Sequence, residues 1–164
     1  MKTINQLITM KTKRMTAILF FAGTSFLLSF APHPKAPKVE IAIIINAANP
    51  VNKMGADFVK NYWLRRFVKR WKEINKGVLP VDHKTKSPEQ DLFYNAVLGL
   101  PSDAVESYLS ARQYQSGDKP PEKFATDADI INYVGNEIGA IGYVSAASVS
   151  ENDKNVKVIL VVSK

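Results

Sequence analysis

Hydrophobic and polar positions change their spacing along the chain, and these changes mark the predicted elements. Residues 39–45 are β-branched and almost all apolar, which predicts a strand buried on both faces of a mainly parallel sheet. Asn46, Asn49 and Pro50 follow with turn-forming chemistry. From Ala56 to about Trp71 apolar side chains recur at helical spacing, which predicts one amphipathic helix.

Three further helices have clear start and stop signals. Each begins at a residue that can cap a helix, and the first also has proline at its first helical position. The predicted helices run from Ser87 to Gly99, from Ser102 to Gly117 and from Thr126 to about Gly135. Short apolar runs predict strands over residues 78–81, 140–144 and 156–162. The order β-α-β-α-α-α-β-β predicts a mixed α/β domain without an internal repeat.

The N-terminal region has the pattern of an export signal. Four basic residues precede an uncharged apolar run over residues 15–30, and the small residues Ser29 and Ala31 favour cleavage after Ala31. If the run is not cleaved, it tethers the domain to the membrane. We therefore predict a signal peptide or membrane anchor over 1–31, a Pro-rich tether over 32–38, and a folded domain over 39–164.

Much of the net positive charge of the chain lies in this N-terminal segment. The whole sequence has a formal net charge of +7, but residues 32–164 carry 18 basic and 15 acidic residues, a net of +3. This mild excess excludes nucleic acid as the default partner. Aromatic and basic residues alternate between 56 and 71, but we interpret them as a core-facing stripe with a solvated basic side rather than a platform for single strands.

Candidate catalytic and metal-binding residues are few. The chain has no cysteine, and its only histidines are His33 in the tether and His83. A metal site or a catalytic triad therefore has little to build from, and no glycine-rich nucleotide loop is present. We predict a protein that is not an enzyme, with no cofactor and no metal. Ser87 reads first as a helix cap, and the Gly139 and Gly142 pair as packing glycines.

Residues 39–164 resemble, nearly end to end, a short periplasmic-binding-protein-like domain (type II) related to the substrate-binding proteins of phosphate ABC transporters. The resemblance rests on motifs in a fixed order: Asn46-Ala-Ala-Asn-Pro50 after the first strand, the aromatic helix up to Trp71, Pro80-Val81, Ser87-Pro88, Leu92-Phe93-Tyr94, Val97-Leu98-Gly99, Tyr108, Ser116-Gly117, Pro120-Pro121 and Gly139-Ala-Ile-Gly-Tyr-Val144. It implies an abbreviated version of that fold, with a mixed sheet flanked by helices.

The resemblance also implies a ligand site. Such proteins have two lobes around a cleft, where backbone amides, hydroxyls and a basic side chain hold the ligand. The relatives carry an arginine four residues before the serine of a Ser-Gly-Thr turn, whereas this chain has His83 and Ser87 there, followed by Pro88 and Glu89. Histidine cannot form the bidentate fork of arginine, so the resemblance implies a weakened or altered site in a shallow cleft.

The predicted ligand-binding residues are Asn46, Asn49, His83, Ser87 and Tyr143. We expect the Asn49 turn and the start of the Ser87 helix to converge on one electropositive hollow, because helix starts favour oxyanions. The predicted function is an exported, periplasmic solute-binding domain for phosphate or a similar small oxyanion, with an ABC transporter permease or another membrane protein as partner. The alternative is a periplasmic accessory or protein-interaction module that has lost ligand binding.

Overall fold

The structure is a computed structural model that describes residues 38–150 and 152–164. The predicted export signal and all but the last residue of the predicted tether lie outside the described residues. The described residues belong to one compact unit, and every buried residue of its two hydrophobic cores lies between positions 41 and 159. Within the described ranges, no helix is both long enough and apolar enough to cross a membrane.

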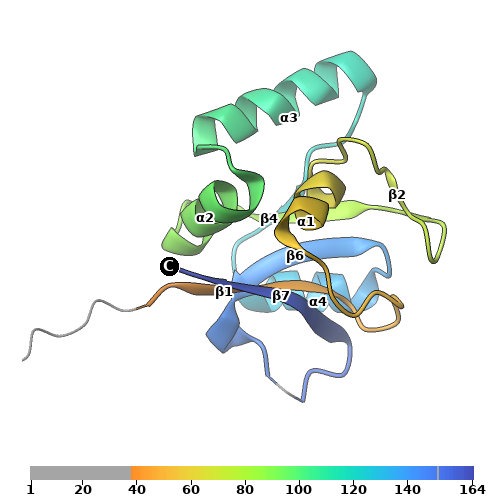
Figure 1. The fold of residues 1–164 in the computed structure, drawn as a ribbon, viewed down its shortest axis with the longest axis vertical. Helices are drawn as coiled ribbons and strands as arrows, with labels where there is room; N and C mark the ends of the chain where they lie inside the picture. Colours follow the sequence, from red (N-terminus) through yellow and green to blue (C-terminus); the bar gives the residue numbers. More distant parts are fainter. Residues whose placement is uncertain (1–37, 151) are drawn as a thin grey trace, which may run out of the picture. The chain divides into compact units, whose positions relative to one another are not determined.

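The centre of the domain is a five-stranded sheet (Figure 1). Its strands are β1 (Glu40–Asn46), β4 (Leu79–His83), β5 (Glu122–Phe124), β6 (Ala140–Ser145) and β7 (Val156–Ser163), in the spatial order β5-β4-β6-β1-β7. Strand β4 is parallel to β5 and β6, but β1 is antiparallel to both of its neighbours. The burial of the first strand on both faces is confirmed. Its expected parallel surroundings are wrong, and β5 was not predicted.

Four α-helices and two short helical segments surround the sheet. They are α1 (Ala56–Trp63), α2 (Pro88–Leu92), the π-helical segment η1 (Phe93–Leu98) that continues α2, α3 (Ser102–Ser116), α4 (Asp127–Asn136) and the 3₁₀ turn η2 (Ala146–Ser148). Most predicted caps are confirmed: Ser87 and Thr126 accept hydrogen bonds from backbone N–H groups of the following turn, and Gly99 and Gly117 are left-handed. Ser102 is the exception, because Pro101 occupies the N-cap of α3.

The predicted helix over residues 56–71 is wrong in its second half. Helix α1 ends at Trp63, Arg65 is left-handed with φ 49°, and the chain forms a small hairpin of β2 (Arg70–Trp71) and β3 (Lys76–Gly77). A continued helix would carry Trp71 roughly 12 Å beyond Trp63. The hairpin instead returns Trp71 to the core, where its ring lies 4.5 Å from that of Tyr62 and its indole N–H donates to the Gly139 carbonyl at 2.8 Å.

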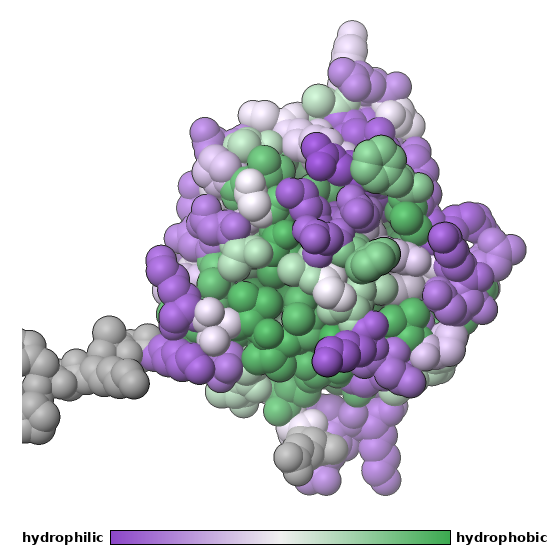
Figure 2. Space-filling model, viewed as in Figure 1, coloured by the Kyte–Doolittle hydropathy of each residue, from purple (hydrophilic) through white to green (hydrophobic). Residues whose placement is uncertain are grey.

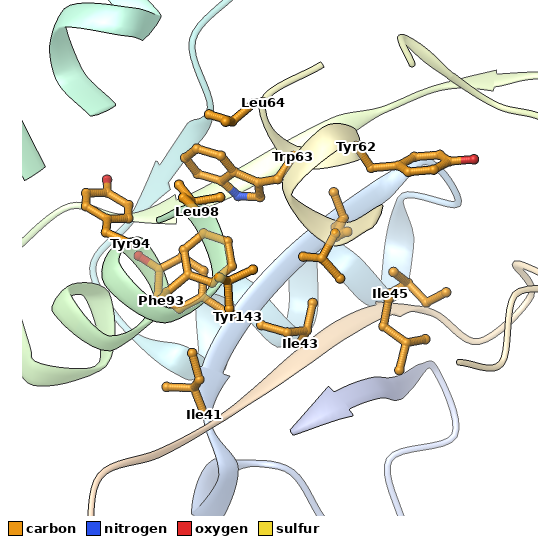
Figure 3. Packing of buried hydrophobic residues seen from close by; sticks show 14 of the residues in the cluster. Ile41, Ile43, Ile45, Tyr62, Trp63, Leu64, Phe93, Tyr94, Leu98 and Tyr143 are labelled. Atoms are coloured by element: carbon orange, nitrogen blue, oxygen red, sulfur yellow. The ribbon is translucent and has the colours of Figure 1, made fainter. Parts of the chain in front are cut away.

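The sheet separates two hydrophobic cores. Ile41, Ile43 and Ile45 of β1 point to one face and pack with side chains of α1, α2, η1 and α3. Figure 3 shows these isoleucines below the rings of Trp63 and Phe93. The alternate residues Ala42 and Ile44 point to the other face and pack beneath α4. This period of two explains why every residue of β1 from 41 to 46 is buried.

Two glycines permit close packing around β6. A Cβ atom on Gly139 would overlap the carbonyl oxygen of Gly77, and one on Gly142 would lie 3.1 Å from the Ile130 side chain and 3.3 Å from that of Val81. The backbone therefore approaches its neighbours more closely than alanine allows. The predicted packing role of this pair is confirmed.

Candidate functional site

Polar side chains gather where the parallel strands β4 and β6 end. We call this group the Asp82 cluster. It combines residues of β4, β6, α2, η1 and the first turn of α4, namely Asp82, His83, Gln90, Tyr94, Asp127 and Tyr143. Asp82 and His83 lie beyond the predicted strand over 78–81, but they are the last two residues of β4 and are buried. Their burial makes this the main site of polar chemistry in the described domain.

The carboxylate of Asp82 is the centre of the cluster. It is fully buried and accepts hydrogen bonds from the Tyr143 hydroxyl at 2.5 Å, the Tyr94 hydroxyl at 2.7 Å and the Gln90 amide at 3.2 Å. The backbone N–H of His83 donates a fourth, at 2.9 Å. A buried carboxylate is tolerable only when its oxygens are satisfied in this way. Asp82 is therefore structural, and it fixes the positions of the two tyrosines.

The two tyrosines are held in their neutral form. Burial is the largest cause, and the nearby charge of Asp82 and its hydrogen bonds add to it, so the pKa of Tyr94 and that of Tyr143 are both raised well above the usual value. The Tyr143 ring also stacks on Phe93 at a centroid distance of 4.0 Å. Tyr143, predicted as a ligand-binding residue, is fully buried and belongs to the core.

His83 lies at the outer edge of the cluster. Its side chain is 10% exposed, and Nε2 lies 3.2 Å from the Tyr143 carbonyl oxygen and 3.5 Å from Oδ1 of Asp127. Both neighbours are acceptors, so Nε2 is the nitrogen that carries a proton. The other oxygen of Asp127 accepts from the Ser145 N–H at 3.0 Å and from the Ser148 hydroxyl at 2.5 Å.

This arrangement does not activate a nucleophile. In a catalytic triad the serine donates to the histidine, whose other nitrogen contacts the acid. Here both Ser148 and His83 contact Asp127, and they are not paired with each other. The described residues also contain no group of three or more His, Cys, Asp or Glu side chains that could hold a metal ion. The cluster can donate and accept hydrogen bonds, and it adds carboxylate charge at the ends of β4 and β6.

The expected convergence of the Asn49 turn and the Ser87 helix start is wrong. Asn46 ends β1 beside the start of β6, because Ile45 pairs with Ile141. Strand β4 runs parallel to β6, so His83 at its end lies near the opposite end of β6. Asn46 and His83 are therefore separated by about four residues of β6, or roughly 13 Å along the strand direction. The antiparallel direction of β1 is the physical reason, and the sequence pattern did not reveal it.

Asn46 and Asn49 both have structural contacts at their own end of the sheet. The Asn46 amide donates to the carbonyls of Val134 and Gly135 at 3.0 and 2.8 Å, which satisfies the last turn of α4. Asn49 is fully buried, and its side-chain oxygen accepts from the Val51 N–H at 3.1 Å. Its Nδ2 has no hydrogen-bond partner among the described residues.

Ser87 lies at the same end of the sheet as His83, and it caps helix α2. Its hydroxyl oxygen accepts from the Gln90 N–H at 3.2 Å. Of the five predicted site residues, the structure therefore brings His83, Ser87 and Tyr143 to one end and Asn46 and Asn49 to the other. Two hollows are lined by neighbours of the first group, but His83, Ser87 and Tyr143 themselves line neither of them. One of about 890 Å³ is lined by Asp127, Ser148 and the loop before β7, and one of about 520 Å³ by Pro88, Asp91 and the last residues of β7.

Sequence reasoning missed Asp82, Gln90 and Tyr94 as members of this site. One signal could have found Asp82: it directly follows the apolar Val78–Val81 run, at the end of a predicted strand, where an acid is buried only if it is paired. Gln90 lies three residues after Ser87, where its backbone N–H donates to the helix cap, and its side chain carried no separate signal. Tyr94 lies on the same helical face as Gln90, four residues later, so a helical plot from Ser87 would have placed them together.

Known structures share this fold. A protein from Clostridium perfringens, described as a phosphate ABC transporter substrate-binding protein with bound phosphate, matches 74% of this chain with a TM-score of 0.58 and 20% identity. An ABC-type phosphate transport receptor from Vibrio cholerae matches with a TM-score of 0.55 and 19% identity, and PstS from Borrelia burgdorferi with 0.53 and 10%. The chain has the fold of part of a phosphate-binding protein. The predicted fold class is thus confirmed.

The match covers less than half of those structures. This chain spans 44% of the Clostridium protein, 46% of the Vibrio protein and 47% of the Borrelia protein. No protein-family model matches the sequence, and no curated protein matches it either. The described residues form one five-stranded sheet with a core on each face, and the separate β2–β3 hairpin.

Proposed function

We propose that this protein is an exported, non-enzymatic binding domain that holds phosphate or a similar small oxyanion at the outer edge of the Asp82 cluster. One observation carries the proposal. The starts of α2 and α4 meet the carboxyl ends of β4 and β6 in a fold shared with a protein crystallised with phosphate. Helix starts present N–H groups and a partial positive charge, which favour an oxyanion.

His83 and Ser87 are the proposed contacts. As an imidazolium, His83 would donate to the oxyanion, which would compete with Asp127 for that charge. Tyr143 contributes indirectly, because its carbonyl oxygen contacts Nε2 of His83 and orients the imidazole. Asn46 and Asn49 are not part of this proposed site, because they lie at the other end of β1 and β6.

The cellular setting is part of the proposal. The predicted export signal would place the domain in the periplasm, free or tethered to the inner membrane by an uncleaved signal. An ABC transporter permease is the proposed partner, because similar folds belong to proteins named for phosphate ABC transport. The described residues match under half of those proteins, so in this proposal they would form one wall of the binding cleft.

Calorimetric titration and thermal unfolding in phosphate or sulfate test the oxyanion site. Ligand at 100 times its dissociation constant stabilises the folded state by about 2.7 kcal/mol, which raises Tm by several degrees. We expect this rise to disappear in His83→Gln and to weaken in Ser87→Ala. Asn49→Ala is the matched control, because it changes a buried polar residue at the other end of the sheet. No stabilisation by any oxyanion at millimolar concentration would contradict the proposal.

A second candidate function follows from a specific observation. The Ser87 hydroxyl and His83 Nε2 already contact other groups of the protein, Pro88 has no N–H, and Glu89 and Asp127 add negative charge nearby. These features favour an accessory module that keeps the fold and has lost the ligand. In that case oxyanions leave Tm unchanged, while cross-linking in intact cells still joins the protein to the permease. A ligand-dependent Tm rise would contradict this second function.

A further inference from the structure

The basic residues of the domain are concentrated in one segment. Residues 60–76 contain seven Lys or Arg and one Glu, a net of +6, whereas residues 32–164 together have a net of +3. The rest of that region is therefore net negative, at −3. Such segregation creates a local positive field that the mild overall charge conceals.

The turn after α1 presents this charge around a shallow hollow. We call it the basic turn, and its hollow of about 440 Å³ is lined by Arg66, Phe67, Val68, Lys69, Arg70 and Lys72. Four of these six residues are cationic and none is acidic. In the view of Figure 2, hydrophilic side chains gather over the neighbouring β2–β3 hairpin. The hollow thus combines positive charge with an apolar side chain.

The backbone of the basic turn is firmly held. Trp71 is fully buried and anchors its end, and the left-handed Arg65 N–H donates to the Tyr62 carbonyl at 3.0 Å. Asp118 joins the turn to the end of α3 by accepting from Lys69 at 2.9 Å and from Arg112 at 2.6 Å. These contacts fix the segment that carries the cations.

Phe67 is the unexplained side chain of this segment. Its side chain is 85% exposed, although Trp63 four residues earlier and Trp71 four residues later in the chain are both buried. A large exposed apolar side chain surrounded by cations is the combination that interfacial membrane binding uses, because the ring enters the acyl boundary while the cations meet anionic headgroups.

We propose that the basic turn docks on an anionic phospholipid membrane, with Phe67 inserted and Arg66 and Lys72 against lipid phosphates. The positive field matches the negative surface of such a membrane. The predicted export signal would deliver the domain to a membrane surface and away from nucleic acid, which is the other polymer that cations and aromatic rings bind. This surface lies apart from the Asp82 cluster and does not depend on the function proposed above.

Vesicle sedimentation with residues 32–164 tests the proposal without the apolar leader. We expect binding to vesicles of equal parts phosphatidylglycerol and phosphatidylcholine, weaker binding at raised salt, and no binding to pure phosphatidylcholine. Each headgroup contact of a cation contributes about fivefold in affinity, so Arg66→Gln with Lys72→Gln should weaken binding about 25-fold. Phe67→Ala should weaken it about tenfold, because the inserted ring is lost.

Matched controls separate the basic turn from general charge and apolarity. Phe58→Ala changes a second exposed phenylalanine, and Lys53→Gln with Lys154→Gln removes two exposed cations elsewhere. Both control variants should bind vesicles with an affinity within about twofold of that of the parent domain. The two double variants lose the same charge, so a general loss of charge would affect them equally. Equal weakening by the basic-turn and control pairs would overturn the proposal. So would tighter binding to a single-stranded oligonucleotide than to vesicles, unaffected by Phe67→Ala. Circular dichroism melting confirms that each variant is folded.

Discussion

The Asp82 cluster and the basic turn both concentrate charge, but they differ in where that charge is satisfied. In the cluster, one buried carboxylate receives four hydrogen bonds from the protein itself. In the basic turn, Asp118 pairs with Lys69 and Arg112, while Arg66 and Lys72 line an open hollow. The comparison teaches that the buried carboxylate at the centre of the cluster is satisfied by the protein itself, whereas the cations of the basic turn face an open hollow.

Removing the centre of the cluster should have the largest effect. Asp82→Ala leaves the two tyrosine hydroxyls and the Gln90 amide buried without their acceptor, so we expect a loss of about 4 kcal/mol of unfolding free energy. Urea denaturation measures this loss. Asp91→Ala on the exposed side of α2 is the control and should change stability by less than about 0.5 kcal/mol. A loss below about 1 kcal/mol for Asp82→Ala would mean that the cluster is not structural.

High pH should weaken the same cluster. The pKa of Tyr94 and that of Tyr143 are raised in the folded state, so their contribution is complete below the unfolded value of about 10 and is lost as pH rises above it. Each tyrosine then reduces stability by about 1.4 kcal/mol per pH unit. Urea unfolding at several alkaline pH values measures the slope. Ultraviolet titration should show Tyr94 and Tyr143 ionising only as the domain unfolds, and their ionisation near the usual pKa of tyrosine in the folded protein would contradict the prediction.

Removing one donor should have a smaller effect than removing the acceptor. In Tyr143→Phe the ring can remain stacked on Phe93, while Asp82 loses one of its hydrogen bonds, so we expect a loss of about 2 kcal/mol. Tyr94→Phe should behave similarly. Tyr114→Phe is the matched control, because its hydroxyl is exposed, and it should have almost no effect. Equal melting temperatures for all three variants would show that the buried hydroxyls do not stabilise Asp82.

The smallest change in stability is expected at the basic turn. The hydrogen bond from Lys69 and the charge of Arg112 hold the pKa of Asp118 below its usual value, but Lys69 is largely exposed. Asp118→Asn should therefore cost less than about 1 kcal/mol. It should also raise the affinity for anionic vesicles, because Lys69 and Arg112 lose their counter-charge. Asp103→Asn is the control. If Asp118→Asn raised the vesicle affinity no more than this control does, the result would contradict the proposed docking surface.

Local signals predicted most of the elements and failed where a distant partner decided the outcome. Ser87 and Thr126 marked helix starts, because capping involves residues only three positions apart. Trp71 misled the same reasoning. The spacing of Trp71 fits a helix, but its indole N–H donates to the carbonyl of Gly139, 68 residues later in the chain. That contact favours a hairpin.

The candidate site shows the same division. His83 and Ser87 were found through the motif resemblance. His83 is the last residue of β4, and Ser87 is the N-cap of α2. The grouping with Asn49 failed, because the direction of β1 relative to β6 decides which turns meet. Asp82 and Tyr94 were missed, because each looks ordinary until the fold brings them within 2.7 Å.

The sequence by itself determined the α/β class, the start and stop of three helices and the double burial of β1, since these depend on residue type and short-range spacing. The tertiary structure alone decided the strand directions, the end of α1 and the pairing of Asp82 with two tyrosines. These features depend on contacts between distant segments, whose free energies outweigh local preference and leave no periodic trace in the chain.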